Sequence, residues 1–199
     1  LYTWDEQFHA LVAKNLIQTP FHPKLFAHPI LPFDYTHWTG NNTWLHKQPL
    51  FLWQMSQSIN AFGNNVFAVR LPSMIMHAII SFYIFRIGIC LLNRRVGFIG
   101  ALMFGVAYFP LELVSGYMST DHNDVAFLFY VTGSIWAWVE YYRSKNQKWL
   151  IVIGLLSGCA VLVKWFVGLL VFMPWGIIVL RKIIIERKFG KNIKPLLIA

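Results

Sequence analysis

The sequence predicts an all-α integral membrane protein with several membrane-spanning helices. Three observations lead to this prediction: 57% of the 199 residues are hydrophobic, only 13% are charged, and the basic residues gather at the ends of long apolar runs. Soluble domains of this size are about half apolar and carry roughly a quarter of charged residues. The composition therefore argues against an ordinary soluble domain.

The net charge of +9 is compatible with nucleic acid or with anionic lipid as a partner. The positions of the charges decide between them, because eleven of the seventeen Lys and Arg residues lie at 94–95, 143–148 and 181–194. Each of these segments ends an apolar run, which is typical of cytoplasmic loops. A nucleic-acid interface would cluster its basic residues on a polar folded surface. We therefore expect membrane lipids as partners and no nucleic acid.

Residues 1–65 are expected to form a non-cytoplasmic loop with two juxtamembrane amphipathic helices. The first covers roughly 5–17, where four apolar residues recur at helical spacing: Phe8, Leu11, Val12 and Leu16. The second begins at Pro49, a favoured first helical position, and ends near Gly63. Its apolar face consists of Leu52, Met55, Ile59 and Phe62, flanked by Phe51 and Trp53. Such a face suits a membrane surface or neighbouring helices.

The region 66–199 is expected to hold the transmembrane helices. Its candidate spans are the apolar runs at about 68–92, 97–115, 124–142, 149–163 and 165–180, followed by the start of a further one. Spanning a bilayer takes about 20 residues, with a lower limit near 17. The last two runs are short, so they form either a tight hairpin around Lys164 or a tilted, partly shielded pair.

The basic segments alternate with the other connections along the chain. This alternation places residues 1–65 and 116–123 together on the non-cytoplasmic side. The chain begins without Met and ends as another apolar run starts. We therefore expect an internal piece of a longer polytopic protein, truncated at both ends.

Three groups of polar residues meet at this outer face. They are Asp5–Glu6 at the start of the first helix, His46–Lys47 before the second, and Asp121 before the run at 124–142. Carboxylates at a helix start also cap free N–H groups and favour the helix dipole. Capping therefore stays an equal alternative for each Asp. His46 and Lys47 have the simpler interpretation of solvated loop residues.

Four titratable residues lie in or beside the expected spans: Arg70, His77, Arg86 and Lys164. Charges inside a membrane are costly and indicate function by default, with snorkelling as the alternative. Arg70 lies at the outer end of its span and can reach headgroups or a ligand phosphate. Arg86 is close enough to the cytoplasmic end to snorkel, whereas the hairpin interpretation puts Lys164 at outer or middle depth.

Four segments occur in order along the chain: "DEQFHALVAKNL", "KQPLFLWQMSQSINAFGNNVFAVRLPS", "YMSTDHNDVAFLFY" and "GLLSGCAVLVKWFVGLLVF". Together they resemble the N-terminal half of bacterial membrane glycosyltransferases of the GT-C fold. The group they look most like is the family of dolichyl-phosphate-mannose protein mannosyltransferases and lipid A aminoarabinose transferases. The resemblance covers nearly the whole chain. It implies a polytopic GT-C helix bundle in the bacterial inner membrane, with the active site facing the periplasm.

The resemblance also implies an activity and a set of site residues. Family members move a sugar from a polyprenyl-phosphate donor to a lipid, glycan or protein acceptor, with inversion at the anomeric carbon. Asp5 matches the family's essential Asp, with Glu6 beside it as a substrate-binding residue, and Asp121 matches its second functional Asp. Lys47 matches the family's Lys near the donor phosphate.

Two departures from the family pattern bear on donor and acceptor choice. In the aminoarabinose transferases the Lys follows a Glu and precedes two prolines, whereas here the stretch reads His46-Lys47-Gln48-Pro49. If that Glu binds a divalent metal ion, either His46 replaces it as a ligand or the metal is absent. A basic residue follows the Asp-Glu motif in some relatives, where Phe8 stands here.

The chemistry of such a transfer needs a base for the acceptor and a cation for the leaving phosphate. A positioned carboxylate contributes roughly 10²–10⁴-fold as a general base, and we assign that role to Asp5. The phosphate is a weak base that needs a cation more than an acid, so Lys47 is its candidate partner, with Arg70 in reserve. Asp121 either positions the acceptor, holds Asp5 or binds a divalent metal.

Two other function classes stay open at this stage. In the first, the chain is a non-catalytic GT-C-like scaffold subunit of a larger complex, and its carboxylates are caps. The second is a transporter or lipid flippase, which would show Gly/Pro-interrupted spans around a midplane site and repeated halves. The polar residues here gather at the outer face instead, which argues against transport.

Overall fold

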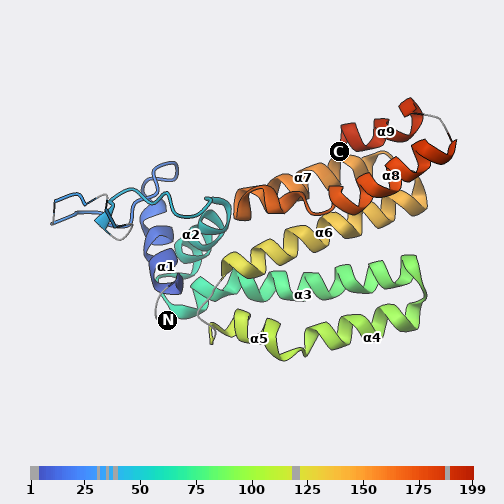
Figure 1. The fold of residues 1–199 in the computed structure, drawn as a ribbon. Coiled ribbons are helices and arrows are strands. Elements are labelled where there is room, and N and C mark those ends of the chain that lie inside the picture. The colour runs from blue at the N-terminus through green and yellow to red at the C-terminus, as the bar shows by residue number, and fades with distance from the viewer. Residues whose placement is uncertain (1–4, 31, 35, 38–39, 118–121, 187–188) are drawn as a thin grey trace. The chain divides into compact units, whose positions relative to one another are not determined.

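The structure is a computed structural model that describes residues 1–199 except 1–4, 31, 35, 38–39, 118–121 and 187–188. Within the described residues the regular elements are all helical, with a single β-bridge between Lys24 and Thr43, which confirms the all-α prediction. In chain order they are α1 (Asp5–Leu16), α2 (Leu50–Phe62), α3 (Val66–Leu91), α4 (Arg94–Gly105), α5 (Tyr108–Ser115), α6 (His122–Ser144), α7 (Lys148–Lys164), the 3₁₀ helix η2 (Trp165–Leu169), α8 (Phe172–Glu186) and α9 (Phe189–Ile198) (Figure 1).

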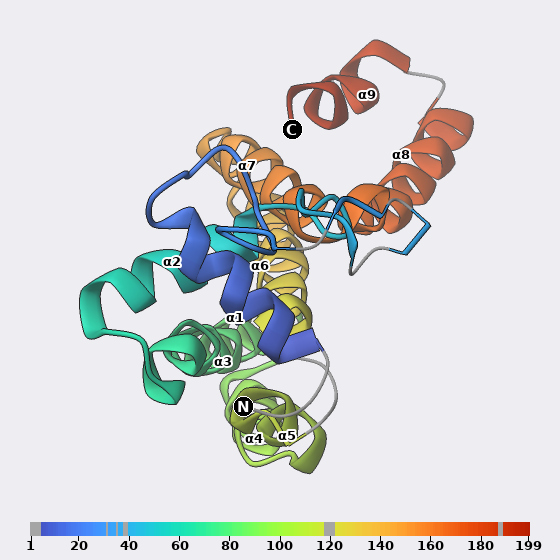
Figure 2. The same ribbon diagram turned by 90° about the vertical axis from the view of Figure 1, so that its left-hand side faces the viewer.

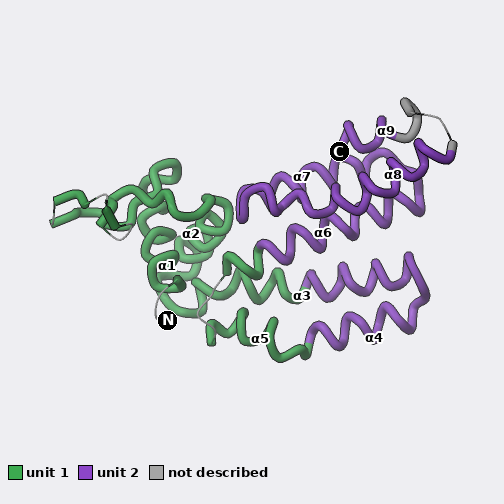
Figure 3. The backbone as a smooth tube through the Cα atoms, in the orientation of Figure 1, with its two compact units in different colours: residues 1–78, 106–126 green, residues 79–105, 127–199 purple. Residues whose placement is uncertain are grey.

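The chain divides into two compact units. Unit 1 holds residues 1–78 and 106–126, and unit 2 holds residues 79–105 and 127–199 (Figure 3). The boundary between the units crosses α3 after residue 78 and α6 after residue 126, so each unit contains one end of each helix.

Helices α1 and α2 pack against each other in unit 1 (Figures 1 and 2). Their contact buries Val12 and Leu16 of α1, as the helical spacing predicts, whereas Leu11 is 37% exposed. Of the apolar face expected on α2, Leu52, Met55 and Ile59 are buried, together with Phe51, and Phe62 at the helix end is exposed. The two amphipathic helices therefore use these faces against each other and their neighbours.

The ends of α2 follow from its sequence. Pro49 is the N-cap residue, and Gly63 ends the helix with a φ of 85° while its N–H bonds to the Ile59 carbonyl. A positive φ is accessible to glycine at little cost, which explains why the helix ends there. The loop between α1 and α2 is closed at its base, where the Asn15 amide donates to the carbonyls of Lys24 and Leu25.

Among the described residues, two helical stretches are long and apolar enough to cross a membrane: Val66–Leu91 and Lys148–Leu169. A third candidate is the pair α4 and α5, which is bent by 46° at its break. Pro110 explains the break, because its ring would clash with the carbonyl four residues earlier in a continuous helix. The chain is thus a membrane protein, and its full five-span arrangement stays a prediction.

The other two expected spans, at about 124–142 and 165–180, correspond to α6 and α8, which are not among these candidates. Helix α6 is long enough to cross a bilayer at 23 residues, but its composition leaves it outside this group. Helix α8 has 15 residues, fewer than a perpendicular span needs. The chain turns back between α7 and α8 through η2, where Gly168 lies so close to the backbone of Ala160 and Val161 that no side chain would fit. This turn favours the hairpin interpretation.

The core of unit 2 lies where α6, α7 and α8 meet. It is formed by Ala137, Leu150, Ile153, Val171, Trp175 and Val179. Helices α3 and α4 lie side by side in Figure 1, and Gly88 and Gly97 approach each other too closely for a Cβ atom on either. Tyr83 of α3 stacks on Trp136 of α6, with ring centroids 4.8 Å apart.

A partly buried ion pair also joins α3 and α6 in unit 2. Two nitrogens of Arg86 contact Oε1 of Glu140 at 2.9 and 2.5 Å, and the Trp136 indole donates to the same oxygen at 3.2 Å. Sequence reasoning expected Arg86 to snorkel toward the cytoplasmic side. The structure instead gives its charge a partner within the bundle.

Candidate active site

The first turn of α1 carries the two carboxylates that the sequence singled out. Asp5 is half-buried, whereas Glu6 is only 3% exposed. Both stand at the helix N-terminus, where a negative charge is favoured by the helix dipole. Their burial differs, so the two carboxylates have different surroundings although they are neighbours in the chain.

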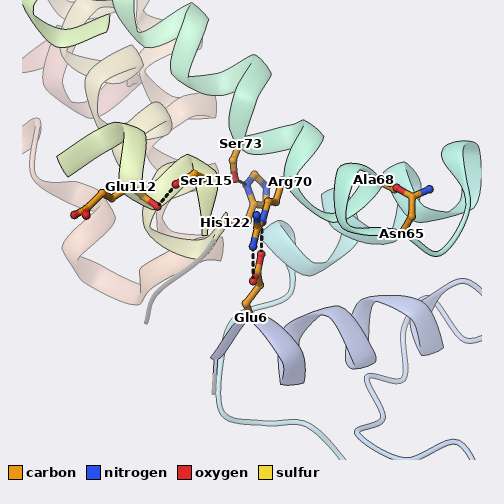
Figure 4. A network of polar contacts seen from close by, with 8 residues as sticks. All are labelled: Glu6, Asn65, Ala68, Arg70, Ser73, Glu112, Ser115 and His122. Carbon is orange, nitrogen blue, oxygen red and sulfur yellow. Dashed lines mark hydrogen bonds and ion pairs between the residues drawn. The ribbon is translucent and has the colours of Figure 1, made fainter. Parts of the chain in front are cut away.

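Glu6 forms a two-pronged ion pair with Arg70 at the start of α3. The Arg70 Nε lies 2.7 Å from Oε1 and its Nη2 lies 3.1 Å from Oε2 (Figure 4). Such parallel hydrogen bonds fix the plane of the carboxylate as well as its distance. The first turn of α1 is therefore tied to α3 next to Asp5.

Gly116 makes room for this ion pair. Any Cβ atom on Gly116 would collide with the guanidinium of Arg70, and the residue also has a φ of 68°. Both constraints require glycine at this position, at the end of α5. Three parts of unit 1, at α1, α3 and the end of α5, thus meet around Arg70.

His46 and Lys47 precede α2 and lie within electrostatic range of Asp5. Partial burial is the main cause that lowers the pKa of His46, the positive charge of Lys47 lowers it further, and the negative charge of Asp5 acts in the opposite direction. A smaller lowering comes from His9, one turn after Asp5 on α1. The structure thus brings Asp5, His46 and Lys47 into one electrostatic neighbourhood.

Aromatic contacts hold this neighbourhood together. The ring of His9 lies 5.6 Å from that of Trp44 and 4.8 Å from that of Phe51, both nearly at right angles. Trp44 in turn lies 5.6 Å from the ring of His46. His9 and Trp44 are both buried, so they fix the segment before α2 against α1. Sequence reasoning named neither residue in this role, because the contacts join three separate segments.

His122 begins α6 and links it to two other helices of unit 1. Its Nδ1 lies 2.8 Å from the Ser73 hydroxyl of α3 (Figure 4), and its Nε2 lies 2.9 Å from Oε1 of Gln54 of α2. An amide oxygen only accepts hydrogen bonds, so this contact requires the tautomer of His122 in which Nε2–H donates a hydrogen bond to Gln54. Sequence reasoning missed this contact as well, since no spacing in the chain relates the three residues.

Asp121 lies outside the described residues, so its predicted role in the site stays a prediction. Asp124 lies in the first turn of α6, in agreement with a helix-start role. Lys164 lies in unit 2, with its Nζ 5.4 Å from the ring centre of Phe127 on α6.

Within the described part of the chain, no three His, Cys, Asp or Glu residues lie together as a metal site requires. The assignment of His46 as a metal ligand therefore stays a prediction. The described residues offer a carboxylate, a lysine and a fixed Arg–Glu pair, which is a set suited to proton transfer and anion binding.

Comparison with known proteins adds one finding. The profile of the family described as "Dolichyl-phosphate-mannose-protein mannosyltransferase" matches residues 46–199. This range includes Lys47, Arg70 and His122, and it leaves α1 outside. No curated protein and no solved structure matches the chain.

Proposed function

Since the chain belongs to the dolichyl-phosphate-mannose-protein mannosyltransferase family, whose members are membrane glycosyltransferases of the GT-C type, we propose that it transfers a sugar from a polyprenyl-phosphate donor to an acceptor. The transfer takes place on the non-cytoplasmic face of the membrane. The observation that carries the proposal is the first turn of α1, where Asp5 adjoins the Glu6–Arg70 ion pair and where ring contacts of His9, Trp44 and His46 join α1 to the segment before α2. The scaffold alternative gains no support from the family match.

In this proposal Asp5 is the general base. An acceptor hydroxyl oxygen forms a bond to the anomeric carbon while the bond from that carbon to the phosphate oxygen breaks. The acceptor proton passes to the Asp5 carboxylate, and the bonding electrons leave with the polyprenyl phosphate. A single displacement of this kind inverts the anomeric centre.

Lys47 binds the phosphate of the donor and stabilises the charge that develops on it as it leaves. Burial and the positive charge of Lys47 lower the pKa of its neighbour His46. Glu6 and Arg70 act as positioning residues: their ion pair fixes the first turn of α1 and with it the direction of Asp5. Arg70 stays a candidate for a further phosphate contact.

The proposal is tested with the full-length protein, purified and supplied with a polyprenyl-phosphate sugar. Asp5→Asn should lower release of polyprenyl phosphate at least 100-fold, because it removes the base and keeps the shape of the side chain. Lys47→Ala should mainly weaken donor binding. Near-normal turnover by Asp5→Asn would show that another group is the base, and an unchanged donor affinity in Lys47→Ala would exclude its phosphate contact.

A further inference from the structure

A groove lies between the C-terminal end of α1 and one face of α2. It has a volume of about 520 Å³, which is within the usual range for small-ligand sites. The residues of α2 that line it recur at helical spacing, as Leu50, Trp53, Gln54, Gln57 and Asn60. This face is opposite in character to the buried face of α2, because it combines an aromatic ring with side-chain amides.

Every residue that lines the groove is uncharged. The amides of Gln54, Gln57 and Asn60 each offer both hydrogen-bond donors and an acceptor. The charged residues of unit 1 that were described above lie instead around the first turn of α1. The groove is therefore suited to a neutral ligand rich in hydroxyl groups rather than to a phosphate.

Trp53 provides a fixed apolar surface in the groove. Its indole N–H donates to the Pro20 carbonyl at 2.7 Å, which orients the ring. The ring of Phe21 lies nearly perpendicular to it at 6.3 Å, and Phe21 is 82% exposed. An aromatic face attracts the C–H groups on the apolar side of a sugar ring, while the amides bond to the hydroxyl groups at its edge.

Gln54 is held in place at one side of this groove. Its Oε1 accepts the hydrogen bond from His122, whose other ring nitrogen contacts the buried Ser73. A polar group that is fixed before the ligand arrives loses less entropy on binding. The groove thus has one immobilised ring and one immobilised amide, and the exposed amides of Gln57 and Asn60 complete it.

We propose that this groove binds the acceptor, and that the acceptor is a neutral oligosaccharide. The inference rests on the proposed function, which requires an acceptor site separate from the donor phosphate. Leu16 at the groove and Asp5 stand eleven residues apart on α1, which is roughly 16 Å at 1.5 Å per residue. The groove therefore holds sugar units remote from the reacting hydroxyl, and their binding positions that hydroxyl.

The test uses the full-length protein in lipid nanodiscs, free of sugar-containing detergent. Two neutral probes, mannotriose and triacetylchitotriose, are examined by saturation-transfer NMR in the wild type and in five variants. Gln57→Ala and Asn60→Ala should each weaken binding of the preferred probe about fivefold, the effect of one hydrogen bond. Trp53→Ala removes the ring, and Trp53→Phe is the substitute that keeps a ring in case Trp53→Ala disturbs folding. Asn64→Ala is the matched control, since Asn64 is an exposed amide outside the groove.

Equal binding by the wild type and the groove variants, or no binding of either probe, overturns the inference. Preferential binding of an uncharged Ser/Thr peptide also overturns it, because the acceptor would then be a protein. Brominated phospholipids would quench the fluorescence of Trp53 if lipid covers the groove, and this outcome would also overturn the inference. The contribution of Trp53 is the difference in quenching between wild type and Trp53→Phe. Release of polyprenyl phosphate is measured in the same samples. Turnover without sugar binding would reject only the acceptor role of the groove. Sugar binding without turnover would reject the proposed transfer function.

Discussion

Helix α3 carries two arginines that each pair with a glutamate, one in unit 1 and one in unit 2. Arg70 contacts both oxygens of Glu6, whereas Arg86 directs two nitrogens to one oxygen of Glu140, which also accepts from Trp136. The first pair orients a carboxylate beside Asp5, and the second joins two helices. In the proposed mechanism the same two residue types thus serve positioning in one unit and helix association in the other.

Burial of the glutamate does not distinguish the two ion pairs. The glutamate side chain is nearly buried in both pairs, at 4% exposure for Glu6 and 8% for Glu140. What differs is the neighbour: Asp5 precedes Glu6 on α1, whereas the Trp136 indole donates a hydrogen bond to Glu140. We therefore expect disruption of the two pairs to have different consequences.

The largest expected effect is on catalysis, from the loss of the unit 1 pair. Glu6→Gln keeps the size of the side chain but removes the charge that orients it, and we expect kcat to fall about 100-fold with a smaller change in donor KM. Arg70→Lys should behave similarly, because an ammonium cannot form the two parallel hydrogen bonds. Steady-state kinetics of the full-length protein provide the measurement.

The matched control for this experiment is the same substitution in the other pair. Glu140→Gln should leave the kcat of folded molecules within about twofold of wild type. If Glu6→Gln and Glu140→Gln lower kcat equally, the positioning role of the unit 1 pair is wrong.

A smaller effect, on stability, is expected from the unit 2 pair. Breaking a fully buried ion pair costs roughly 3–5 kcal/mol, but the side chain of Arg86 is 35% exposed. We therefore expect Glu140→Gln to lower the free energy of unfolding by about 2 kcal/mol. Denaturant titration in bicelles measures this change. The double variant Arg86→Met/Glu140→Met should recover most of it, because no unpaired charge remains, and a double variant as unstable as the single one would contradict the role of charge.

The parts of the fold that the sequence predicted are those that local pattern determines. Helical spacing located α1 and α2, and Pro49 and Gly63 marked the ends of α2 because their backbone preferences are local. Apolar length identified Val66–Leu91 as a span. The break at Pro110 was not predicted, although the proline itself was a visible signal.

The ion pair, hydrogen bonds and aromatic contacts of the site could not be predicted from the sequence, because they are not local. The partners of Arg70 and of His122 come from segments far apart in the chain, and no periodicity links them. The positive-inside rule predicted that Asp5 and Lys47 lie on the same side of the membrane, and topology alone cannot predict a closer approach. The bidentate contact and the aromatic packing of His9 depend on side-chain geometry that only the folded chain provides.

The smallest expected effect concerns His46, and it tests whether the charged end of unit 1 is one site. Partial burial, Lys47 and His9 lower its pKa below the ordinary value of 6.5, and Asp5 opposes them. Removing a neighbour should therefore shift the pKa in a direction fixed by that neighbour's charge. Lys47→Ala should raise the pKa of His46, and Asp5→Asn should lower it further.

NMR titration of histidine-labelled protein measures both shifts, with His46→Gln to assign the signal. Because the pKa is lower in the folded state, the unfolded chain binds the proton first, so the stability that His46 contributes is present above its ordinary pKa and is lost as the pH falls through the folded value. Opposite shifts in the two variants would show that the charges of Asp5 and Lys47 both act on His46. An unchanged pKa of His46 in Asp5→Asn would instead separate the base from the phosphate-binding lysine, and the proposed site would then be wrong in joining them.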